Sequence, residues 1–243
     1  MKHIHRFFVN EILSSGQAVR LSSDDTFHAS RVLRLRPGDH MELADADCRA
    51  FLAEVTQVGG RVEAMVGDEL PQLPATSLHL TVIQAVPKGK KMDLVVEKLS
   101  EIGVGSLVPV YMDDSLARLN AAGGGRLDRW RRIARASAGQ SRRAGVMEIA
   151  EPVSFAGWIQ SWNGPLIVLA TEIDGAPLGS AAEKAESPLA LLVGPEAGFS
   201  EEEIGLLQER DAIFASLGGQ VLRTETAALV AAAIVMHRLG GLG

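Results

Sequence analysis

Two uninterrupted apolar segments, PLIVLAT (165–171) and PLALLVG (188–194), constrain the fold of this chain more than any other feature. Strands without polar alternation are typical of parallel sheets that are covered on both faces. Further strands are expected over 77–86, 106–112 and 212–218, and helices over 93–103, 127–143 and 225–239. This alternation predicts an α/β fold, in which helices lie on both faces of a mostly parallel sheet.

The residues before Pro71 follow a different pattern. Ser23 is expected to cap a helix over 24–35, which Pro37-Gly38-Asp39 ends. Gly59-Gly60 is typical of a hairpin turn between strands. Strands are expected over residues 6–9, 41–45, 49–58 and 61–67. Because Pro71 and Pro74 continue neither element, we predict a mostly β domain over residues 1–72 and an α/β domain over 73–243.

The composition predicts a cytoplasmic protein without a metal. The single cysteine, Cys48, excludes an internal disulfide, as expected of a reducing compartment. Neither a signal peptide nor an apolar run long enough for a membrane span is found in the sequence. His3 and His5 could chelate a metal, but no third ligand lies near them in the sequence, so no metal site is expected.

The positive charge is concentrated in one part of this acidic chain, whose net charge is −6. Residues 84–143 carry 12 Lys and Arg against 6 Asp and Glu, whereas residues 144–243 carry 4 against 13. Along the helix over 127–143, apolar residues such as Trp130 and Ala134 fall on one side and the arginines on the other. Like charges at this spacing destabilise an isolated helix, so the pattern favours a polyanionic partner over a merely solvated face.

Three strands are followed by unusual loops, which begin at Thr171-Glu172, Gly194 and Leu217. Ligands of α/β sheets bind beyond the carboxyl ends of the strands, where glycines let them approach backbone N–H groups. Structural explanations exist as well, because Ser200 with Glu203 forms a capping box and Thr224-Glu225 suits the start of a helix. The loops that begin at Gly194 and Leu217 are not phosphate-binding loops of the GxxxxGKS/T or GxGxxG type.

These loops, GPEAGFSEEEI (194–204) and SLGGQVLRTETA (216–227), resemble the signatures of the ribosomal RNA small subunit methyltransferase E family, in the SPOUT superfamily. The resemblance extends to RFFV (6–9), HASRVLRLRPGDHMELAD (28–45), KGKKMDLVVEKLSEIGV (88–104) and GQSRR (139–143), and so covers nearly the whole chain. It implies a PUA-like β-barrel over 1–72 and a SPOUT domain with a deep trefoil knot over 73–243. It also implies a homodimer that uses S-adenosyl-L-methionine (SAM) to methylate N3 of a uridine in small-subunit (16S) ribosomal RNA, free or in an assembled subunit.

The resemblance also implies which residues form the site. Arg223 and Glu225 are the candidate catalytic residues, with Arg223 stabilising charge on the uracil carbonyl. The expected SAM-binding residues are Leu169, Thr171, Gly194, Pro195, Glu196, Gly198, Leu217, Gly218, Leu222, Arg223, Thr224, Thr226 and Ala227. The expected RNA-binding residues are Arg6, Arg31, Arg34, Lys88, Arg131, Arg135, Gln140, Arg142 and Arg143. Ala197, Gly139 and Met147 depart from the family pattern, where glycine, glutamate and proline are usual.

Two alternatives stay open. One is a SPOUT ribose 2′-O-methyltransferase of transfer or ribosomal RNA, against which the N-terminal module speaks. The other is a non-catalytic RNA-binding protein of ribosome assembly, for which the two loops would have no purpose. An enzyme that methylates C5 is disfavoured, because its cysteine nucleophile would have to be Cys48, in the other domain.

Overall fold

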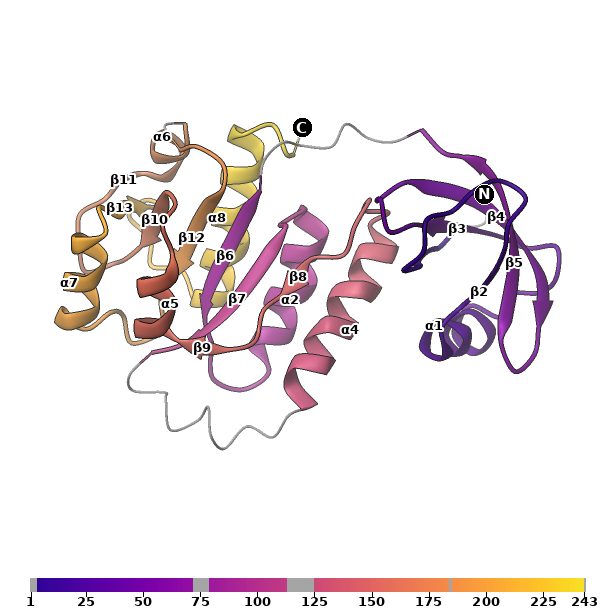
Figure 1. The fold of residues 1–243 in the computed structure, drawn as a ribbon. Helices are drawn as coiled ribbons and strands as arrows, with labels where there is room; N and C mark the ends of the chain where they lie inside the picture. The colour runs from indigo at the N-terminus through magenta and orange to yellow at the C-terminus, as the bar shows by residue number, and fades with distance from the viewer. Residues whose placement is uncertain (1–3, 72–78, 113–124, 184, 243) are drawn as a thin grey trace. The chain divides into compact units, whose positions relative to one another are not determined.

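The computed structural model describes residues 4–71, 79–112, 125–183 and 185–242 (Figure 1). The chain divides into an N-terminal unit, Met1–Ala75 with Ala138–Val146, and a C-terminal unit, Thr76–Ser137 with Met147–Gly243. The segment 138–146 therefore returns to the N-terminal unit, which the sequence did not predict. The predicted domain boundary at residues 72 and 73 lies outside the described residues, as does His3.

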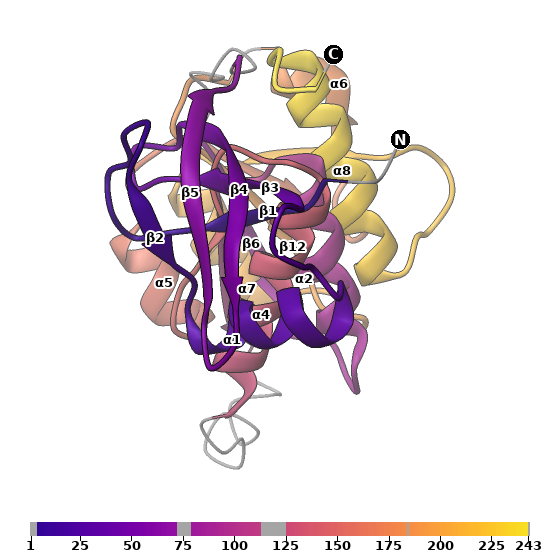
Figure 2. The ribbon, with the colours of Figure 1, turned by 90° about the vertical axis from the view of Figure 1, so that its right-hand side faces the viewer.

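The N-terminal unit is built on a five-stranded sheet, ordered β1-β3-β4-β5-β2. Its strands are β1 (Arg6–Phe8), β2 (Ala18–Arg20), β3 (His40–Ala44), β4 (Ala50–Val58) and β5 (Val62–Glu69). Only the β1–β3 pair is parallel, and β2, β4 and β5 stand side by side in Figure 2. Phe51, Ala53 and Val55 alternate into the core of this unit, as a strand period of two requires. The three-residue β2 was not predicted.

The helical segment of the N-terminal unit has two parts, α1 (Ser23–Phe27) and the π-helix η1 (His28–Val32). The predicted cap, Ser23, is wrong by one residue, because the Ser22 hydroxyl accepts the hydrogen bond from the Asp25 N–H. The helix also ends before residue 35, since Arg34 adopts a left-handed φ of 53°.

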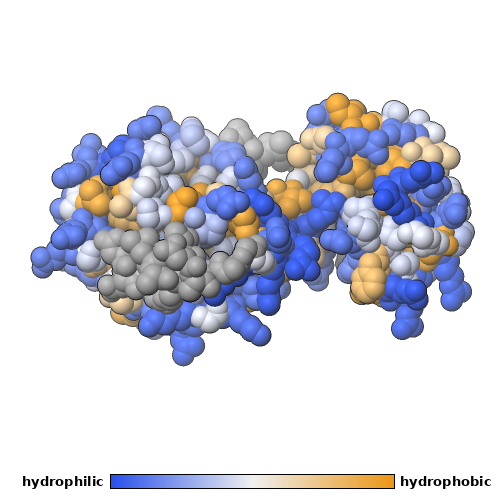
Figure 3. All heavy atoms as spheres, turned by 60° about the horizontal axis from the view of Figure 1, so that its bottom comes forward, coloured by the Kyte–Doolittle hydropathy of each residue, from blue (hydrophilic) through white to orange (hydrophobic). Residues whose placement is uncertain are grey.

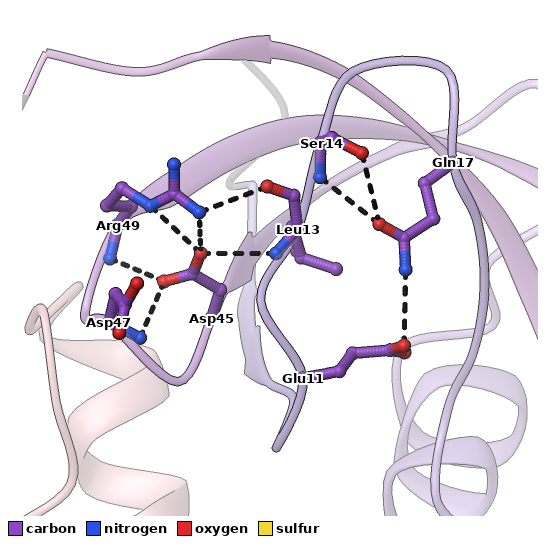
Figure 4. A network of polar contacts seen from close by, with 7 residues as sticks. All are labelled: Glu11, Leu13, Ser14, Gln17, Asp45, Asp47 and Arg49. Atoms are coloured by element: carbon purple, nitrogen blue, oxygen red, sulfur yellow. Dashed lines mark hydrogen bonds and ion pairs between the residues drawn. The ribbon is translucent and has the colours of Figure 1, made fainter.

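A buried carboxylate, Asp45, ties the turn after β3 to the loop before β2 (Figure 4). Its oxygens accept hydrogen bonds from the backbone N–H groups of Leu13, Asp47 and Arg49, and its ion pair with the Arg49 guanidinium measures 2.7 Å. Burial opposes the charge, but the N–H groups of Arg49 and Leu13 and the guanidinium outweigh it and lower the pKa of Asp45. The ionised form of Asp45 therefore stabilises this unit.

The C-terminal unit contains a sheet in which every pair of described strands is parallel, ordered β11-β13-β10-β12-β6-β7-β8. The strands are β6 (Leu80–Ala85), β7 (Ser106–Tyr111), β8 (Glu148–Ile149), β10 (Leu166–Leu169), β11 (Ala176–Pro177), β12 (Leu189–Val193) and β13 (Ile213–Ser216), and β9 (Val153–Ser154) pairs with β7. The parallel α/β sheet predicted from the apolar runs is thus confirmed.

Helices cover both faces of this sheet (Figure 1). They are α2 (Lys91–Ile102), α4 (Gly125–Gln140), α5 (Phe155–Ser161), α6 (Leu178–Ala182), α7 (Glu201–Glu209) and α8 (Thr224–Arg238). Leu191 and Val193 of β12 pack with α2, α4, α6 and α8, whereas Ala190 and Leu192 pack with α5 and α7. Both faces of the strand are buried, which explains its uninterrupted apolar sequence.

The ends of two helices test the sequence signals for helix termination. Gly103 closes α2 with a φ of 108°, as predicted. The predicted helix over 127–143 is three residues too long, because α4 ends at Gln140 and Arg142 has a left-handed φ of 55°. Five short elements, α5, α6, β8, β9 and β11, were not predicted. In the described part of the chain, no helix is both long and apolar enough to cross a membrane.

Candidate cofactor site

A cavity of about 510 Å³ lies at the carboxyl ends of three adjacent strands, β10, β12 and β13. Its walls come from the segments that follow these strands, residues 169–175, 193–199 and 215–224, with Ala227 of α8. Because parallel neighbours end at the same edge of a sheet, segments that are distant in the sequence meet there. The three strand ends singled out in the sequence therefore form one site, of a volume typical of small-molecule sites.

Glycines allow close approaches both within and between these segments. A Cβ at Gly194 would lie 2.6 Å from the Phe199 ring, and one at Gly198 would overlap the Glu172 carboxylate. Gly198 also has a φ of 80°, which a residue with a side chain rarely adopts. Ala197 is not among the residues of positive φ, so its departure from the family glycine leaves the backbone unstrained.

The hydroxyl of Thr224 connects the second loop to the first and to the centre of the sheet. It donates to the Gly194 carbonyl at 2.7 Å and accepts from the amide of Gln84 at 3.0 Å. Gln84 lies on β6 and is fully buried. The N-cap of α8 is Arg223, not Thr224, and it makes no side-chain capping bond. The side chain of Thr224 is thus used to fix the position of both cofactor-site loops.

Lys91 joins the same two loops by charge. Its ammonium lies 3.1 Å from the Glu196 carboxylate and 3.4 Å from that of Glu225. The bond to Glu196 raises the pKa of Lys91. Partial burial opposes ionisation of Glu196, but the bond and charge of Lys91 together with nearby backbone N–H groups outweigh it and lower the pKa of that carboxyl. The sequence reading missed this role of Lys91, because 105 residues separate it from Glu196.

The two candidate catalytic residues are placed differently. Arg223 is exposed, lines the cavity and has no ion-pair partner among the described residues. Glu225 is 8% exposed, does not line the cavity, and has a buried oxygen, Oε2, without a hydrogen bond. Arg223 and Glu225 do not form an ion pair with each other, and Glu225 is paired with Lys91 instead.

The other predicted cofactor-binding residues are gathered by the fold. All of them except Thr226 line the cavity, and Thr226 is exposed on the first turn of α8. Several lining residues were not named individually as cofactor-binding residues, namely Glu172, Ile173, Asp174, Gly175, Phe199, Ser216, Gly219, Gln220 and Val221. Of these, residues 219–221 lie within the loop from Leu217 onward that the sequence indicated. In the sequence, all of these lining residues are marked only by their position close to the predicted strand ends.

The predicted RNA-binding residues are divided between the two units. Arg6, Arg31, Arg34, Gln140, Arg142 and Arg143 belong to the N-terminal unit, and Lys88, Arg131 and Arg135 to the C-terminal unit. On α4, Trp130 and Ala134 are buried and Arg131 is exposed, as the helix pattern predicts. Arg131 also donates to the Ile149 carbonyl at 3.2 Å, so it stabilises the C-terminal unit.

Arg6 is fixed inside the N-terminal unit. Its guanidinium forms a 2.8 Å ion pair with Glu42 and donates to the carbonyls of Arg142 and Arg143. A Cβ at Gly139 would lie 2.5 Å from the Arg6 carbonyl oxygen. The glycine at position 139 is therefore required by the close approach of β1, and a glutamate there would not fit this packing.

Among the described residues, no group of three or more His, Cys, Asp or Glu side chains is arranged to hold a metal ion. The cavity is instead built from backbone and apolar groups around a few polar side chains.

Known proteins are similar to this chain in sequence and in fold. Residues 74–236, which include the cavity, match the family of RNA methyltransferase domains. The chain therefore belongs to this class of protein. The chain is 32% identical to the ribosomal RNA small subunit methyltransferase E of Mycobacterium bovis, across 93% of this chain and 88% of that protein. The chain therefore belongs to the ribosomal RNA small subunit methyltransferase E family.

Solved structures agree along nearly the whole chain. The ribosomal RNA small subunit methyltransferase E of Neisseria gonorrhoeae, bound to S-adenosyl methionine, has a TM-score of 0.85 at 30% identity, covering 97% of this chain and 98% of that chain. A methyltransferase of Legionella pneumophila in complex with SAM has a TM-score of 0.83 at 26% identity, with the same coverage.

Proposed function

We propose that this protein transfers the methyl group of SAM to N3 of a uridine in small-subunit (16S) ribosomal RNA. The observation that carries the proposal is the cavity formed by the 194–199 and 215–224 loops in a member of this family. SAM supplies an electrophilic methyl group, so the chain has to bind and orient two substrates and to accommodate one proton.

The residues of the cavity fit SAM. A volume of about 510 Å³ suits a ligand of this size, and the glycine-rich loops present backbone groups to it. In this proposal, the cofactor contacts the backbone of Gly194, Pro195, Leu217 and Gly218, and Leu222 and Ala227 enclose its adenine. All six residues line the cavity. Relatives with SAM bound support this assignment.

Arg223 and Glu225 receive separate roles. The proton on N3 has to leave, and negative charge then spreads to the uracil carbonyls. Arg223 lines the cavity without an ion-pair partner among the described residues, so its guanidinium is available to stabilise that charge. Glu225 lies away from the cavity and pairs with Lys91, which also pairs with Glu196. We therefore assign Glu225 a positioning role, in which it orients the 194–199 loop through Lys91.

The remaining expectations belong to the same proposal. The N-terminal sheet is proposed as a PUA-like RNA-binding barrel, and the C-terminal unit as a SPOUT domain whose chain forms a trefoil knot. A homodimer is supported by α8, whose surface is largely small and apolar and includes Val230 at 38% exposure. Sedimentation of the protein at micromolar concentration tests the dimer, and a monomer would contradict it.

The decisive experiment is methylation of small ribosomal subunits from a strain that lacks this protein, in parallel with their deproteinised RNA. Nucleoside analysis of the product is expected to yield 3-methyluridine, and the comparison identifies the form of the substrate. A 2′-O-methylated nucleoside would show instead a ribose methyltransferase. Binding of RNA without SAM binding, measured by calorimetry, would show a non-catalytic assembly protein.

A further inference from the structure

A second cavity, of about 320 Å³, lies in the C-terminal unit at the carboxyl ends of β6 and β7. The loop after β6 and the first turns of α2 and α4 complete its walls. Away from the grey atoms, the face that carries the start of α4 is mainly hydrophilic (Figure 3). Nothing in the proposed cofactor site uses this cavity, so its own residues have to indicate its ligand.

The cavity carries an excess of positive charge. Lys88, Lys90 and Arg126 line it and have no side-chain partner among the described residues, whereas Arg129 is paired with Asp93, its one lining acid. The backbone adds to this charge, because no side chain caps the first N–H groups of α2. Three unpaired cations around one small cavity fit a phosphate group.

Two buried aromatic residues form another part of the wall. Tyr111 is 3% and Trp130 4% exposed, and both line the cavity. Neither the Tyr111 hydroxyl nor the Trp130 indole N–H has a hydrogen-bond partner among the described residues. Both atoms remain in contact with solvent. In this they differ from Gln84 Oε1 and Glu225 Oε2, which are buried without a hydrogen bond. Aromatic faces with free polar groups beside cations are typical of sites that hold a nucleotide of single-stranded RNA.

The second cavity adjoins the first. The strands β12 and β6 are neighbours, and the first cavity extends from β12 while the second extends from β6. Glu196 of the first cavity forms an ion pair with Lys91, which directly follows Lys90 of the second cavity. The 87–91 loop is therefore in contact with the cofactor cavity through Glu196.

From this arrangement we infer that the second cavity binds a phosphate-bearing nucleotide of the RNA substrate and holds it beside the cofactor. The inference rests on the proposed function, because it makes the cavity a subsite for the same RNA. Lys88, Lys90 and Arg126 contact the phosphate, and Tyr111 and Trp130 contact the base.

The test measures affinity for a ten-residue oligouridylate as a function of salt concentration, using full-length Lys90→Gln and Arg126→Gln variants. Lys98→Gln is the matched control. Lys98 lies on α2, the helix that begins after Lys90, but its charge is paired with Glu97 and Glu101. For single strands, each neutralised phosphate contributes about 0.7 to the log–log salt slope. Because both cations contact the same phosphate, a variant with both substitutions should lose up to about 0.7. Calorimetry with SAM accompanies each variant and is expected to show unchanged affinity.

A second probe identifies the part of the nucleotide that is bound. Photo-crosslinking with 4-thiouridine 5′-monophosphate is expected to label the peptide that contains Tyr111 or Trp130, and 4-thiouridine without phosphate to label it several-fold less. Equal salt slopes for Lys90→Gln, Arg126→Gln and Lys98→Gln would overturn the inference. If the wild type methylates RNA while these slopes are equal, the subsite alone is wrong. If the slopes fall but nothing is methylated, the proposed function is wrong and the RNA site stands.

Discussion

Replacing Thr224 by valine removes the one hydroxyl that holds the two cofactor loops together. Valine keeps the size and the branched Cβ of threonine, so the packing around residue 224 is preserved. The Gly194 carbonyl loses its donor, and the Gln84 amide loses one of its two acceptors. The variant therefore tests the contribution of the hydroxyl to loop position with little change in volume.

The magnitude follows from the surroundings of each group. Gln84 is fully buried but keeps its hydrogen bond to the Ala85 carbonyl at 2.9 Å. Loss of its bond to the Thr224 hydroxyl should therefore cost about 0.5–1.5 kcal/mol. Gly194 is only half-buried, so water partly replaces its lost donor. The free energy of unfolding should fall by about 1–3 kcal/mol in total. Because 1.4 kcal/mol corresponds to tenfold, partial loosening of the loop should weaken SAM binding by about threefold to tenfold.

Urea unfolding and titration calorimetry with SAM measure these two effects. Thr226→Val is the matched control, because Thr226 lies on the same turn of α8 but is exposed and does not line the cavity. Thr224→Ser, which restores a hydroxyl, should recover most of the SAM affinity. If Thr224→Val and Thr226→Val had the same stability and the same SAM affinity, the hydrogen bonds of Thr224 would not position the loops.

Three further predictions concern strain, rate and pH. Gly198→Ala should lose about 1–3 kcal/mol of stability in thermal unfolding and weaken SAM binding. Gly60→Ala, which lies in the N-terminal unit with open space around its Cβ, should change neither. Arg223→Ala should slow single-turnover methyl transfer by roughly a hundredfold at saturating RNA; a normal rate would remove Arg223 from the mechanism. Asp45→Asn should cost about 1.5–3 kcal/mol near neutral pH. Folding lowers the pKa of Asp45, so the difference in unfolding free energy between wild type and Asp45→Asn should persist above pH 3.8 and shrink as the pH falls below that value. A stability difference that is constant with pH would contradict this role.

Local signals in the sequence predicted most of the secondary structure of the C-terminal unit. Buried parallel strands are recognisable because apolar residues follow one another without a break. The capping box at Ser200 is confirmed in both directions, at 3.2 Å from the Glu203 N–H and 2.9 Å to its carboxylate. Short elements such as α6, LGSAA, were missed because five residues are too few to show a helical period.

The site was predicted less completely, because its geometry depends on the order of the strands. The sequence indicated three strand ends, but not that β10 lies between β12 and β13. That order brings residues 172–175 to the same cavity as Gly194 and Leu222. Gly194→Val, an obvious test of cofactor binding from sequence alone, also proves unsuitable, because its Cβ would press on the Phe199 ring. Such contacts between distant residues have no signature in the local sequence.

The basic segment shows most clearly why charge alone does not identify a binding surface. Arg6 and Glu42 use their charges within the N-terminal unit, and burial lowers the pKa of the Arg143 guanidinium. On α4, Arg129 is paired with an acid, whereas Arg126 has no acidic partner within the described segments. The sequence gives these arginines equal weight, since nothing local distinguishes a paired side chain from an unpaired one. A phosphate gains most from cations whose charge is not already neutralised and whose position is fixed by a cavity. By that criterion, Lys88, Lys90 and Arg126 of the second cavity are better suited to bind a phosphate than exposed arginines that line neither cavity, such as Arg131.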